Sequence, residues 1–202
     1  MAANNIQFTP IELMIAKYFF KHYNDRFNSR QLAKLLNINH AHTNKLCNLL
    51  ASKLLLNKEE IGNAVYFSFN YDNKFAIKFM EYLLTLEEHE FPGWLSVVLH
   101  NLKKFNENIL MGIVFGSSIK NSKFNDVDVL LVYDAAKTKT ISKIKEEIRQ
   151  SQLIVQPIRY VDLAEKDLLL NKNDKIFYNI LSESLIFHNS EKYVEVIRKC
   201  HK

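Results

Sequence analysis

Two carboxylates stand at the start of an apolar run in the second half of the chain. The segment "IVFGSSIKNSKFNDVDVLLVYD", residues 113–134, places Asp126 and Asp128 directly before "VLLVY". Alternate residues of a strand project to the same face, so these two side chains are expected to lie side by side. Burying an unpaired carboxylate is costly unless a proton, a cationic side chain or a metal ion offsets its charge. The pair therefore suggests a functional site.

The expected partner of the two acids is a divalent cation. Two like charges a few ångströms apart raise each other's pKa unless a cation lies between them. Oxygen ligands of this kind suit Mg²⁺ or Mn²⁺, which bind substrate phosphates while keeping several waters. Gly116 would let the backbone approach a phosphate closely, and Ser117 would offer its hydroxyl and amide. These residues together predict a site for a nucleoside triphosphate and a metal ion.

A purely structural explanation of the same residues stays open. The turn before the strand suits Asp126, since aspartate is a common turn residue. Asp128 can pair with a lysine of the preceding loop, either Lys120 or Lys123. Ser117 can be the N-cap of a short helix.

Composition limits the class of protein. The 202 residues are 48% hydrophobic, which allows one large domain or two small ones. The net charge of +5 suits an anionic partner, although so small an excess is common in proteins that bind no nucleic acid. The two cysteines are far apart and no apolar run approaches the length of a membrane span. We expect a cytoplasmic protein with free thiols and no membrane contact.

The N-terminal part is predicted to contain three helices followed by a β-hairpin. Thr9, with Pro10 and Glu12 after it, is the expected cap of the first helix, and Asn28 and Asn39 are the expected caps of the second and third. Gly62-Asn63 is the expected turn of the hairpin. This order is typical of a winged-helix domain.

A winged-helix domain would place its third helix in the major groove of DNA. The polar residues expected on that surface are His40, Asn44, Lys45 and Asn48 of the third helix and Arg30 and Lys34 of the second. Asparagine can read adenine through two hydrogen bonds, and the cations can meet phosphates. The same residues also suit an ordinary solvated face, and Glu59 and Glu60 in the hairpin oppose phosphate contact. DNA is the expected partner, with protein contacts as the alternative.

The C-terminal part carries a family resemblance. "FGS" followed by "DVDVLLV" resembles the G-S and D-x-D signature of the DNA polymerase beta type nucleotidyltransferase superfamily, particularly its minimal members. With the N-terminal helices, nearly the whole chain is similar to prokaryotic proteins that join a winged-helix regulator to such a domain. The resemblance implies an α/β (α+β) fold. Its parts would be a winged helix-turn-helix domain over 1–71, a linker helix over 72–92 and a nucleotidyltransferase-fold domain over 93–202, with a mixed sheet flanked by helices.

The resemblance also implies roles for individual residues. It assigns triphosphate binding to the loop residues Gly116, Ser117, Ser118 and Lys120. It assigns metal binding and catalysis to Asp126 and Asp128. Active members need a third carboxylate on a later strand. The strand expected over 153–162 has Gln156 at about that position, and an amide cannot accept the proton. Asp162, at the end of this strand, is the candidate substitute, and the loop from Ser118 to Asn125 lacks the Arg-Gly that minimal members commonly carry.

Three functions fit these expectations. The first is an enzyme that transfers a nucleotidyl group from a nucleoside triphosphate to a protein, RNA or small molecule. The second is a DNA-binding regulator whose nucleotidyltransferase domain is catalytically degenerate. The third is an antitoxin-like adaptor that uses both domains for protein contacts. A protein partner and a homodimer are compatible with all three, and fold alone does not separate them.

Overall fold

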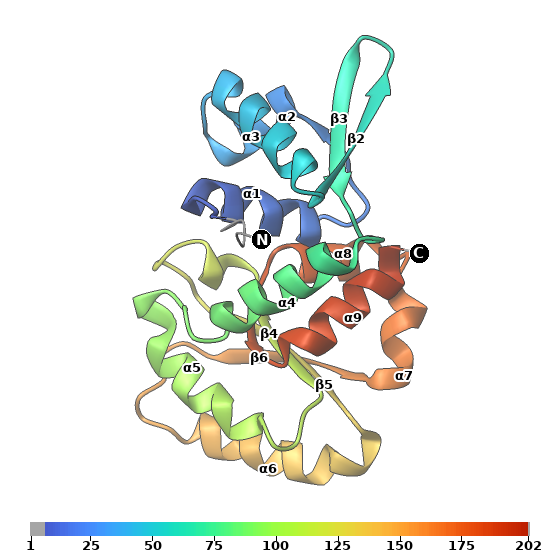
Figure 1. Cartoon of the computed structure of the whole chain (residues 1–202). Helices are drawn as coiled ribbons and strands as arrows, with labels where there is room; N and C mark the ends of the chain where they lie inside the picture. The colour runs from blue at the N-terminus through green and yellow to red at the C-terminus, as the bar shows by residue number, and fades with distance from the viewer. Residues whose placement is uncertain (1–6, 202) are drawn as a thin grey trace. The chain divides into compact units, whose positions relative to one another are not determined.

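The structure, a computed structural model, describes residues 7–201. The chain is a mixed α and β protein that divides into two compact units, residues 1–80 and 81–202 (Figure 1). The division falls inside helix α4 (Lys74–Glu87), within the segment expected to connect two domains. Residues 1–6 and 202, which the expected domains included, lie outside the described part. None of the helices within 7–201 is both long and apolar enough to cross a membrane.

The first unit contains three helices and a small antiparallel sheet. In chain order its elements are α1 (Pro10–Lys21), β1 (Phe27–Asn28), α2 (Ser29–Leu36), α3 (His40–Ser52), β2 (Leu56–Ile61) and β3 (Ala64–Phe69). The strands lie in the order β1-β3-β2. The β2–β3 hairpin turns at Gly62, whose φ of 59° suits glycine, and Ile61 pairs with Ala64 across the turn. The expected helices and hairpin are therefore present.

The helix starts coincide with the capping residues read from the sequence. The Glu12 backbone amide donates to Thr9 Oγ1 at 3.3 Å, and the Thr9 amide donates to Glu12 Oε2 at 2.7 Å. Asn28 and Gln31 form a second reciprocal pair before α2, and Asn39 caps α3. Each cap supplies partners to amides that the helix leaves unpaired, so local sequence fixes where these helices begin.

Glu12 is a buried acid whose ionised form stabilises the first unit. Its side chain is 3% exposed and accepts hydrogen bonds from Thr9 and from Lys53 Nζ, the latter at 2.8 Å. Burial acts to raise the pKa of Glu12, but the hydrogen bonds from Lys53 and Thr9 outweigh it and lower the pKa below 4.5. The folded unit therefore favours the carboxylate over the protonated acid.

Acid should consequently weaken the first unit. Because the folded pKa is depressed, the contribution of Glu12 is complete above 4.5 and is lost as pH falls through the folded value. We expect Glu12→Gln to cost about 1–3 kcal/mol at neutral pH. On acidification, the free energy of unfolding of the Glu12→Gln variant should fall less than that of the wild type. Hydrogen exchange of amides in α1 and α3 of the full chain measures both effects, and equal acid sensitivity in the two proteins would contradict the expectation.

The second unit is built on a four-stranded mixed sheet. Its strands are β4 (Met111–Phe115), β5 (Val127–Tyr133), β6 (Ile158–Ala164) and β7 (Ser184–His188), in the order β6-β5-β4-β7. β4 runs antiparallel to β5 and β7, whereas β5 and β6 are parallel. The α-helices after α4 are α5 (Ser96–Leu102), α6 (Thr138–Arg149), α7 (Glu165–Leu168), α8 (Lys175–Ser182) and α9 (Ser190–His201). A mixed sheet with helices on its faces is what the sequence led us to expect.

One strand begins later than expected. The apolar segment from Leu153 was predicted to be extended, but residues 150–157 form a loop and β6 starts at Ile158. The carbonyl of Pro157 accepts the first bond from the Val127 amide at 3.0 Å. Proline has no amide hydrogen, so the ladder does not extend further toward the N-terminus. Gln156 therefore lies in the loop and not on the strand.

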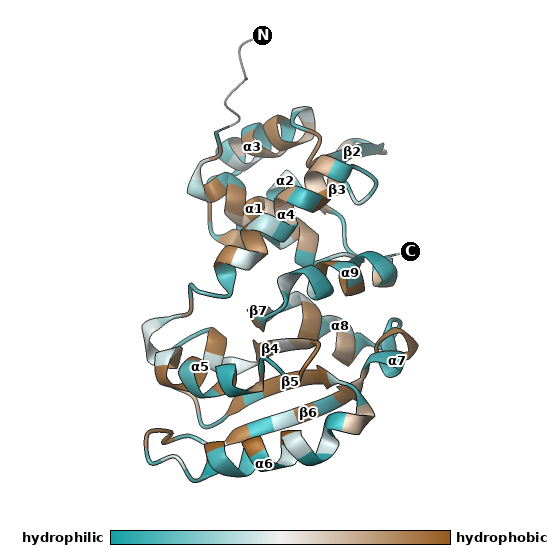
Figure 2. Ribbon diagram, turned by 60° about the horizontal axis from the view of Figure 1, so that its bottom comes forward, coloured by the Kyte–Doolittle hydropathy of each residue, from teal (hydrophilic) through white to brown (hydrophobic). Residues whose placement is uncertain are grey.

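Both faces of β5 are largely apolar, and Asp128 shares its face with the fully buried Leu130 and Val132. Val127, Val129 and Leu131 belong to a buried core with residues of α5 and α6, and most of β5 is apolar (Figure 2). On β4, a Cβ at Gly112 would lie 2.2 Å from the ring of Phe187, so glycine is needed there to admit this ring to the core. Asp128 alternates with the core residues and so belongs to the opposite face.

Candidate functional site

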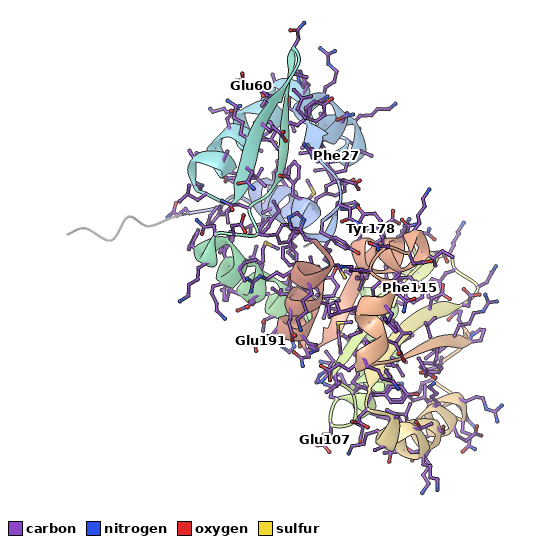
Figure 3. All side chains as sticks on the ribbon, turned by 90° about the vertical axis from the view of Figure 1, so that its right-hand side faces the viewer. Phe27, Glu60, Glu107, Phe115, Tyr178 and Glu191 are labelled. Carbon is purple, nitrogen blue, oxygen red and sulfur yellow. The ribbon has the colours of Figure 1, made fainter. Side chains whose placement is uncertain are left out.

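Four segments of the second unit meet at one edge of its sheet. Phe115, which is labelled in Figure 3, is the last residue of β4. It pairs with Asp128 on β5 and with Ser184 on β7. Asp128 in turn pairs with Arg159 on β6. The end of β4 and the beginnings of β5, β6 and β7 therefore lie together. The two acids predicted to be functional stand at this edge.

Asp126 has an arginine as its partner. Asp126 Oδ2 lies 2.9 Å from Arg159 Nη2. The aspartate side chain is 16% exposed and the arginine side chain 71% exposed, so the guanidinium lies on the solvent side of the pair. Lys120 and Lys123, the lysines considered from the sequence as partners of Asp128, form no ion pair with that acid among residues 7–201, and Lys120 pairs with Glu183 instead. Because an exposed arginine loses little on changing partners, a ligand anion can compete for it.

Asp128 carries a charge that the fold only partly offsets. Burial and the neighbouring charge of Asp126 raise the pKa of Asp128, and Arg159 counteracts part of that rise. Within 7–201, Asp128 forms no ion pair. A carboxylate whose charge is only partly offset is stabilised more by an added cation than a solvated carboxylate is. The site therefore carries negative charge that a bound cation would offset.

The loop after β4 closes onto Asp128. Gly116 has φ of 81°, which L-residues with side chains rarely adopt, and a Cβ at this position would lie 2.5 Å from Asp128 Oδ2. The backbone at Gly116 therefore touches the carboxylate directly. The sequence indicated that this glycine permits a close approach, and the structure identifies the neighbouring group as an acid of the site.

The other loop residues differ in availability. Ser117 is exposed at the start of a short 3-10 turn, beside Gly116. Ser118 is fully buried, and its carbonyl accepts from Trp94 Nε1 at 3.0 Å, so this serine holds the loop. Lys120 Nζ lies 2.5 Å from a carboxylate oxygen of Glu183, and both side chains are exposed. Ser117 can meet a ligand directly, Lys120 only after leaving Glu183, and Ser118 only after leaving the interior.

Asp162 does not join the acidic pair. It pairs with Leu131 across β5 and β6, and Leu131 belongs to the core face of the sheet. Its carboxylate oxygens lie 2.5 and 2.7 Å from Lys145 Nζ on α6, and burial together with the charge of this carboxylate raises the pKa of Tyr133. The β6 residue paired with Asp128 is Arg159. A cation therefore stands at the position where a third carboxylate would complete the site.

Arg159 and Glu183 are site residues that the sequence argument missed. Arg159 was overlooked because the predicted strand began too early, which left the register of β6 relative to β5 undetermined. Pro157 was the available signal, since a proline commonly marks the first position of a strand ladder. Glu183 precedes β7, and only the pairing of β7 with β4 brings it to this edge.

The donor set suits a metal ion that arrives with its ligand. No group of three or more histidine, cysteine, aspartate or glutamate residues able to hold a metal occurs within 7–201. Mg²⁺, however, is commonly bound by one or two carboxylates together with substrate phosphates and waters. Asp126 and Asp128 provide such a pair, and the uncompensated charge of Asp128 favours a cation. The residues fit Mg²⁺ or Mn²⁺ bound to a polyphosphate better than a free ion.

The first unit offers a second candidate surface. On α2 and α3 the exposed members of the predicted set are Arg30, Lys34, His40, Asn44 and Lys45. His40 Nε2 lies 3.1 Å from the Ser29 hydroxyl, which anchors this ring to α2. Half-buried Asn48 donates to the carbonyl of Asn44 at 2.8 Å. Asn48 also donates to Asn44 Oδ1 at 3.3 Å, so Lys45 is freer to meet a partner than either asparagine.

Comparison with known proteins does not identify a relative. No protein-family model, curated protein or solved structure matches the chain.

Proposed function

We propose that the protein is a DNA-binding winged-helix protein whose C-terminal unit has the nucleotidyltransferase fold and binds a nucleoside triphosphate with Mg²⁺ or Mn²⁺. The observation that carries the proposal is the juxtaposition of Asp126, Asp128 and Gly116 at one sheet edge, with the charge of Asp128 only partly offset. The order of strands in the mixed sheet supports the same resemblance.

Each residue at this edge has a task in nucleotide binding. Asp126 and Asp128 would hold the metal ion, which when bound neutralises charge on the phosphates. Arg159 would leave Asp126 for a phosphate oxygen, because guanidinium binds phosphate through paired hydrogen bonds. Ser117 would donate its hydroxyl or amide to the phosphates. When the nucleotide enters, the metal ion would thereby replace Arg159 as the partner of Asp126, and Arg159 would bind a phosphate.

Binding without nucleotidyl transfer is the function that the geometry supports best. Transfer needs a group that accepts the proton of the attacking hydroxyl, and a guanidinium such as that of Arg159 cannot do so. Asp162 is occupied by Lys145 on the other face of the sheet. The second unit would then serve as a nucleotide-binding module of a regulator and not as an enzyme.

Calorimetry with a non-hydrolysable ATP or CTP analogue and Mn²⁺ tests the nucleotide site. We expect saturable binding that requires the metal, and no transfer of label from ATP or CTP to any acceptor. Arg159→Gln should weaken analogue binding about ten-fold, the cost of one charged hydrogen-bonding partner. Binding that is independent of metal and unchanged in Arg159→Gln would overturn the proposal. Transfer of label would instead assign catalysis to the site.

The winged-helix part of the proposal is supported by the first unit. Three helices lead into an antiparallel hairpin, and Arg30, Lys34 and Lys45 are exposed on the two helices that such a domain places against DNA. Glu60 is exposed on the hairpin and Glu59 pairs with Arg26 there, so the hairpin contributes less to phosphate binding (Figure 3). The helices would provide most of the contact.

Substituting Lys45 should weaken DNA binding and reduce its salt dependence. A lysine that neutralises one phosphate contributes about one to the slope of log K against log salt. We expect Lys45→Ala to lower that slope by about this amount, measured by fluorescence anisotropy with a labelled duplex. Lys139→Ala, on α6 of the second unit, is the matched control and should bind as the wild type. Equal slopes for the two variants would remove Lys45 from the interface.

A further inference from the structure

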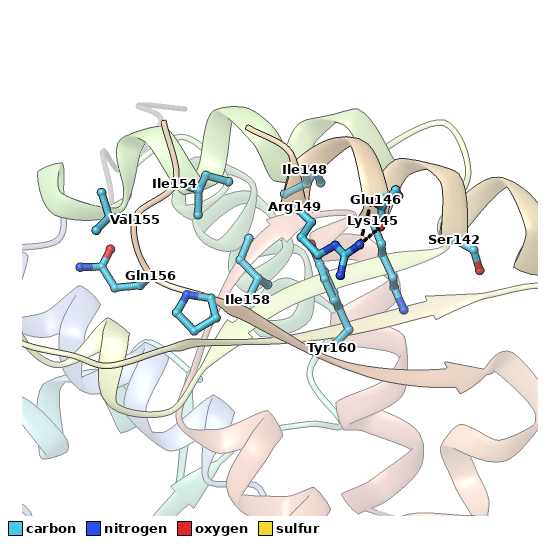
Figure 4. Close-up of a pocket in the computed structure, with 11 residues that line it drawn as sticks. Ser142, Lys145, Glu146, Ile148, Arg149, Ile154, Val155, Gln156, Ile158 and Tyr160 are labelled. Atoms are coloured by element: carbon cyan, nitrogen blue, oxygen red, sulfur yellow. Dashed lines mark hydrogen bonds and ion pairs between the residues drawn. The ribbon is translucent and has the colours of Figure 1, made fainter. Parts of the chain in front are cut away.

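A cavity of about 610 Å³ lies on the core side of the second unit, away from the face that bears Asp128. It opens between α6, the loop 150–157 and the start of β6. A volume of this size is typical of small-molecule sites. In Figure 4 the side chains of Ile154 and Gln156 come from the loop, and those of Lys145 and Arg149 from α6. The cavity is separate from the candidate nucleotide site.

The wall of this cavity is mainly apolar. Ile148, Ile154, Pro157 and Ile158 line it, and Val155 in the same loop is 85% exposed. Apolar side chains that face a solvent-accessible hollow gain free energy when a ligand removes them from water. A ligand with a planar or compact hydrocarbon group would pack against these side chains.

Tyr160 adds a polar group that the protein leaves unsatisfied. Its hydroxyl oxygen is buried and has no hydrogen-bond partner among the described residues. Burial and the nearby charge of Asp162 raise the pKa of Tyr160, so the hydroxyl stays protonated and can donate. The side chain points from β6 toward α6, and Lys145 Nζ lies 4.7 Å from the centre of its ring (Figure 4). A buried donor without an acceptor is costly, and a ligand acceptor would relieve that cost.

Cationic groups accompany this donor. Lys145 is held by Asp162, whereas Arg149 is 78% exposed and binds Glu146 through Nη2 at 2.9 Å. A guanidinium has five N–H donors, so Arg149 retains donors for a further anion. With Asp162 counted, the two cations and the two acids around the cavity balance. The guanidinium donors that Arg149 retains, and not a net charge, therefore favour an acceptor such as a carboxylate.

We propose that the cavity binds a small aromatic carboxylate. The ring would pack against Ile148, Ile154 and Ile158, and the carboxylate would accept from the Tyr160 hydroxyl and from Arg149. The site is independent of nucleotide binding, and it gives Asp162 a role: its ion pair holds Lys145 beside the ring of Tyr160.

Titration of the full-length protein with 2-naphthoate tests the proposal. Methyl NMR signals of Ile148, Ile154 and Ile158 should shift and saturate with a Kd of about 1 mM, which corresponds to about 0.3 kcal/mol for each of about 13 non-hydrogen atoms. Tyr160→Phe should weaken binding about five-fold, the effect of one lost hydrogen bond. Tyr82→Phe makes the same chemical change at an exposed tyrosine of this unit and should bind as the wild type.

A neutral probe isolates the contribution of charge. Arg149→Gln should weaken 2-naphthoate about five-fold while leaving 2-naphthalenemethanol unchanged. Absence of saturable methyl shifts in the wild type would overturn the proposal. So would equal affinity of Tyr160→Phe and Tyr82→Phe. Equal loss of both probes in Arg149→Gln would overturn the preference for an anion.

Discussion

Asp128→Asn is expected to abolish metal-dependent binding of the nucleotide analogue. The substitution removes one of the two carboxylates proposed to hold the metal ion, so the Kd should rise about 100-fold. The amide keeps the size of the side chain against Gly116, whose backbone touches this carboxylate. The loss of analogue binding would therefore be caused by the missing charge and not by a displacement of the loop at Gly116. Calorimetry with Mn²⁺ and the analogue measures it.

The same substitution should make the second unit more stable. Burial and Asp126 raise the pKa of Asp128, which means that the fold disfavours its ionised form. The destabilisation is present above the raised folded pKa and disappears as the acid becomes protonated at lower pH. Asparagine has no charge, so we expect a gain in stability at neutral pH, smaller than about 1 kcal/mol because Asp128 is only half-buried and solvent screens its charge. Urea unfolding at neutral pH measures this gain.

Asp162→Asn is the matched control for Asp128→Asn. Asp162 is an aspartate of the same sheet, but its charge pairs with Lys145. Its substitution should lower stability and leave analogue binding unchanged. If the two variants behaved alike in both measurements, the distinction between a functional and a structural carboxylate would be wrong.

Much of the local structure could be predicted because short-range chemistry decides it. Thr9, Asn28 and Asn39 start their helices through hydrogen bonds to residues three positions along the chain. Gly62 turns the hairpin because glycine tolerates its positive φ. Asp128 lies on the opposite face of β5 from the core valines, as strand alternation requires. None of these features depends on distant segments.

The composition of the site depended on pairings that the sequence does not encode locally. Arg159 meets Asp126 only because β6 lies parallel to β5 in one particular register. A shift of one residue would have turned Arg159 toward the core and brought a neighbouring residue to the acids. Glu183, before β7, pairs with Lys120 in the loop after β4 because β7 lies beside β4. The register of β6 likewise places Asp162 beside Lys145 and not beside the two acids. Register, and not residue type, separated the expected site from the observed one.

Arg159→Asp should convert the edge into a site that binds a metal ion without nucleotide. The substitution removes the cation that pairs with Asp126 and adds a third carboxylate at the residue paired with Asp128. Three acids at one point suit Mn²⁺, and two opposite charges near a protein surface interact by about 4 kcal/mol at 4 Å. We therefore expect Mn²⁺ alone to bind at least about ten-fold more tightly than to the wild type, measured by calorimetry.

The metal-free variant should show the cost of the added acid. Arg159 lowers the pKa of Asp128, so replacing it with an acid raises that pKa further and reduces stability above it, where the group is ionised. Saturating Mn²⁺ should restore the lost stability, because a ligand that binds only the folded state stabilises it. Arg159→Gln removes the cation without adding an acid and should show a smaller effect on both measurements. Equal Mn²⁺ affinity in Arg159→Asp and the wild type would mean that the three side chains do not converge, and the divalent site at Asp126 and Asp128 would have to be abandoned.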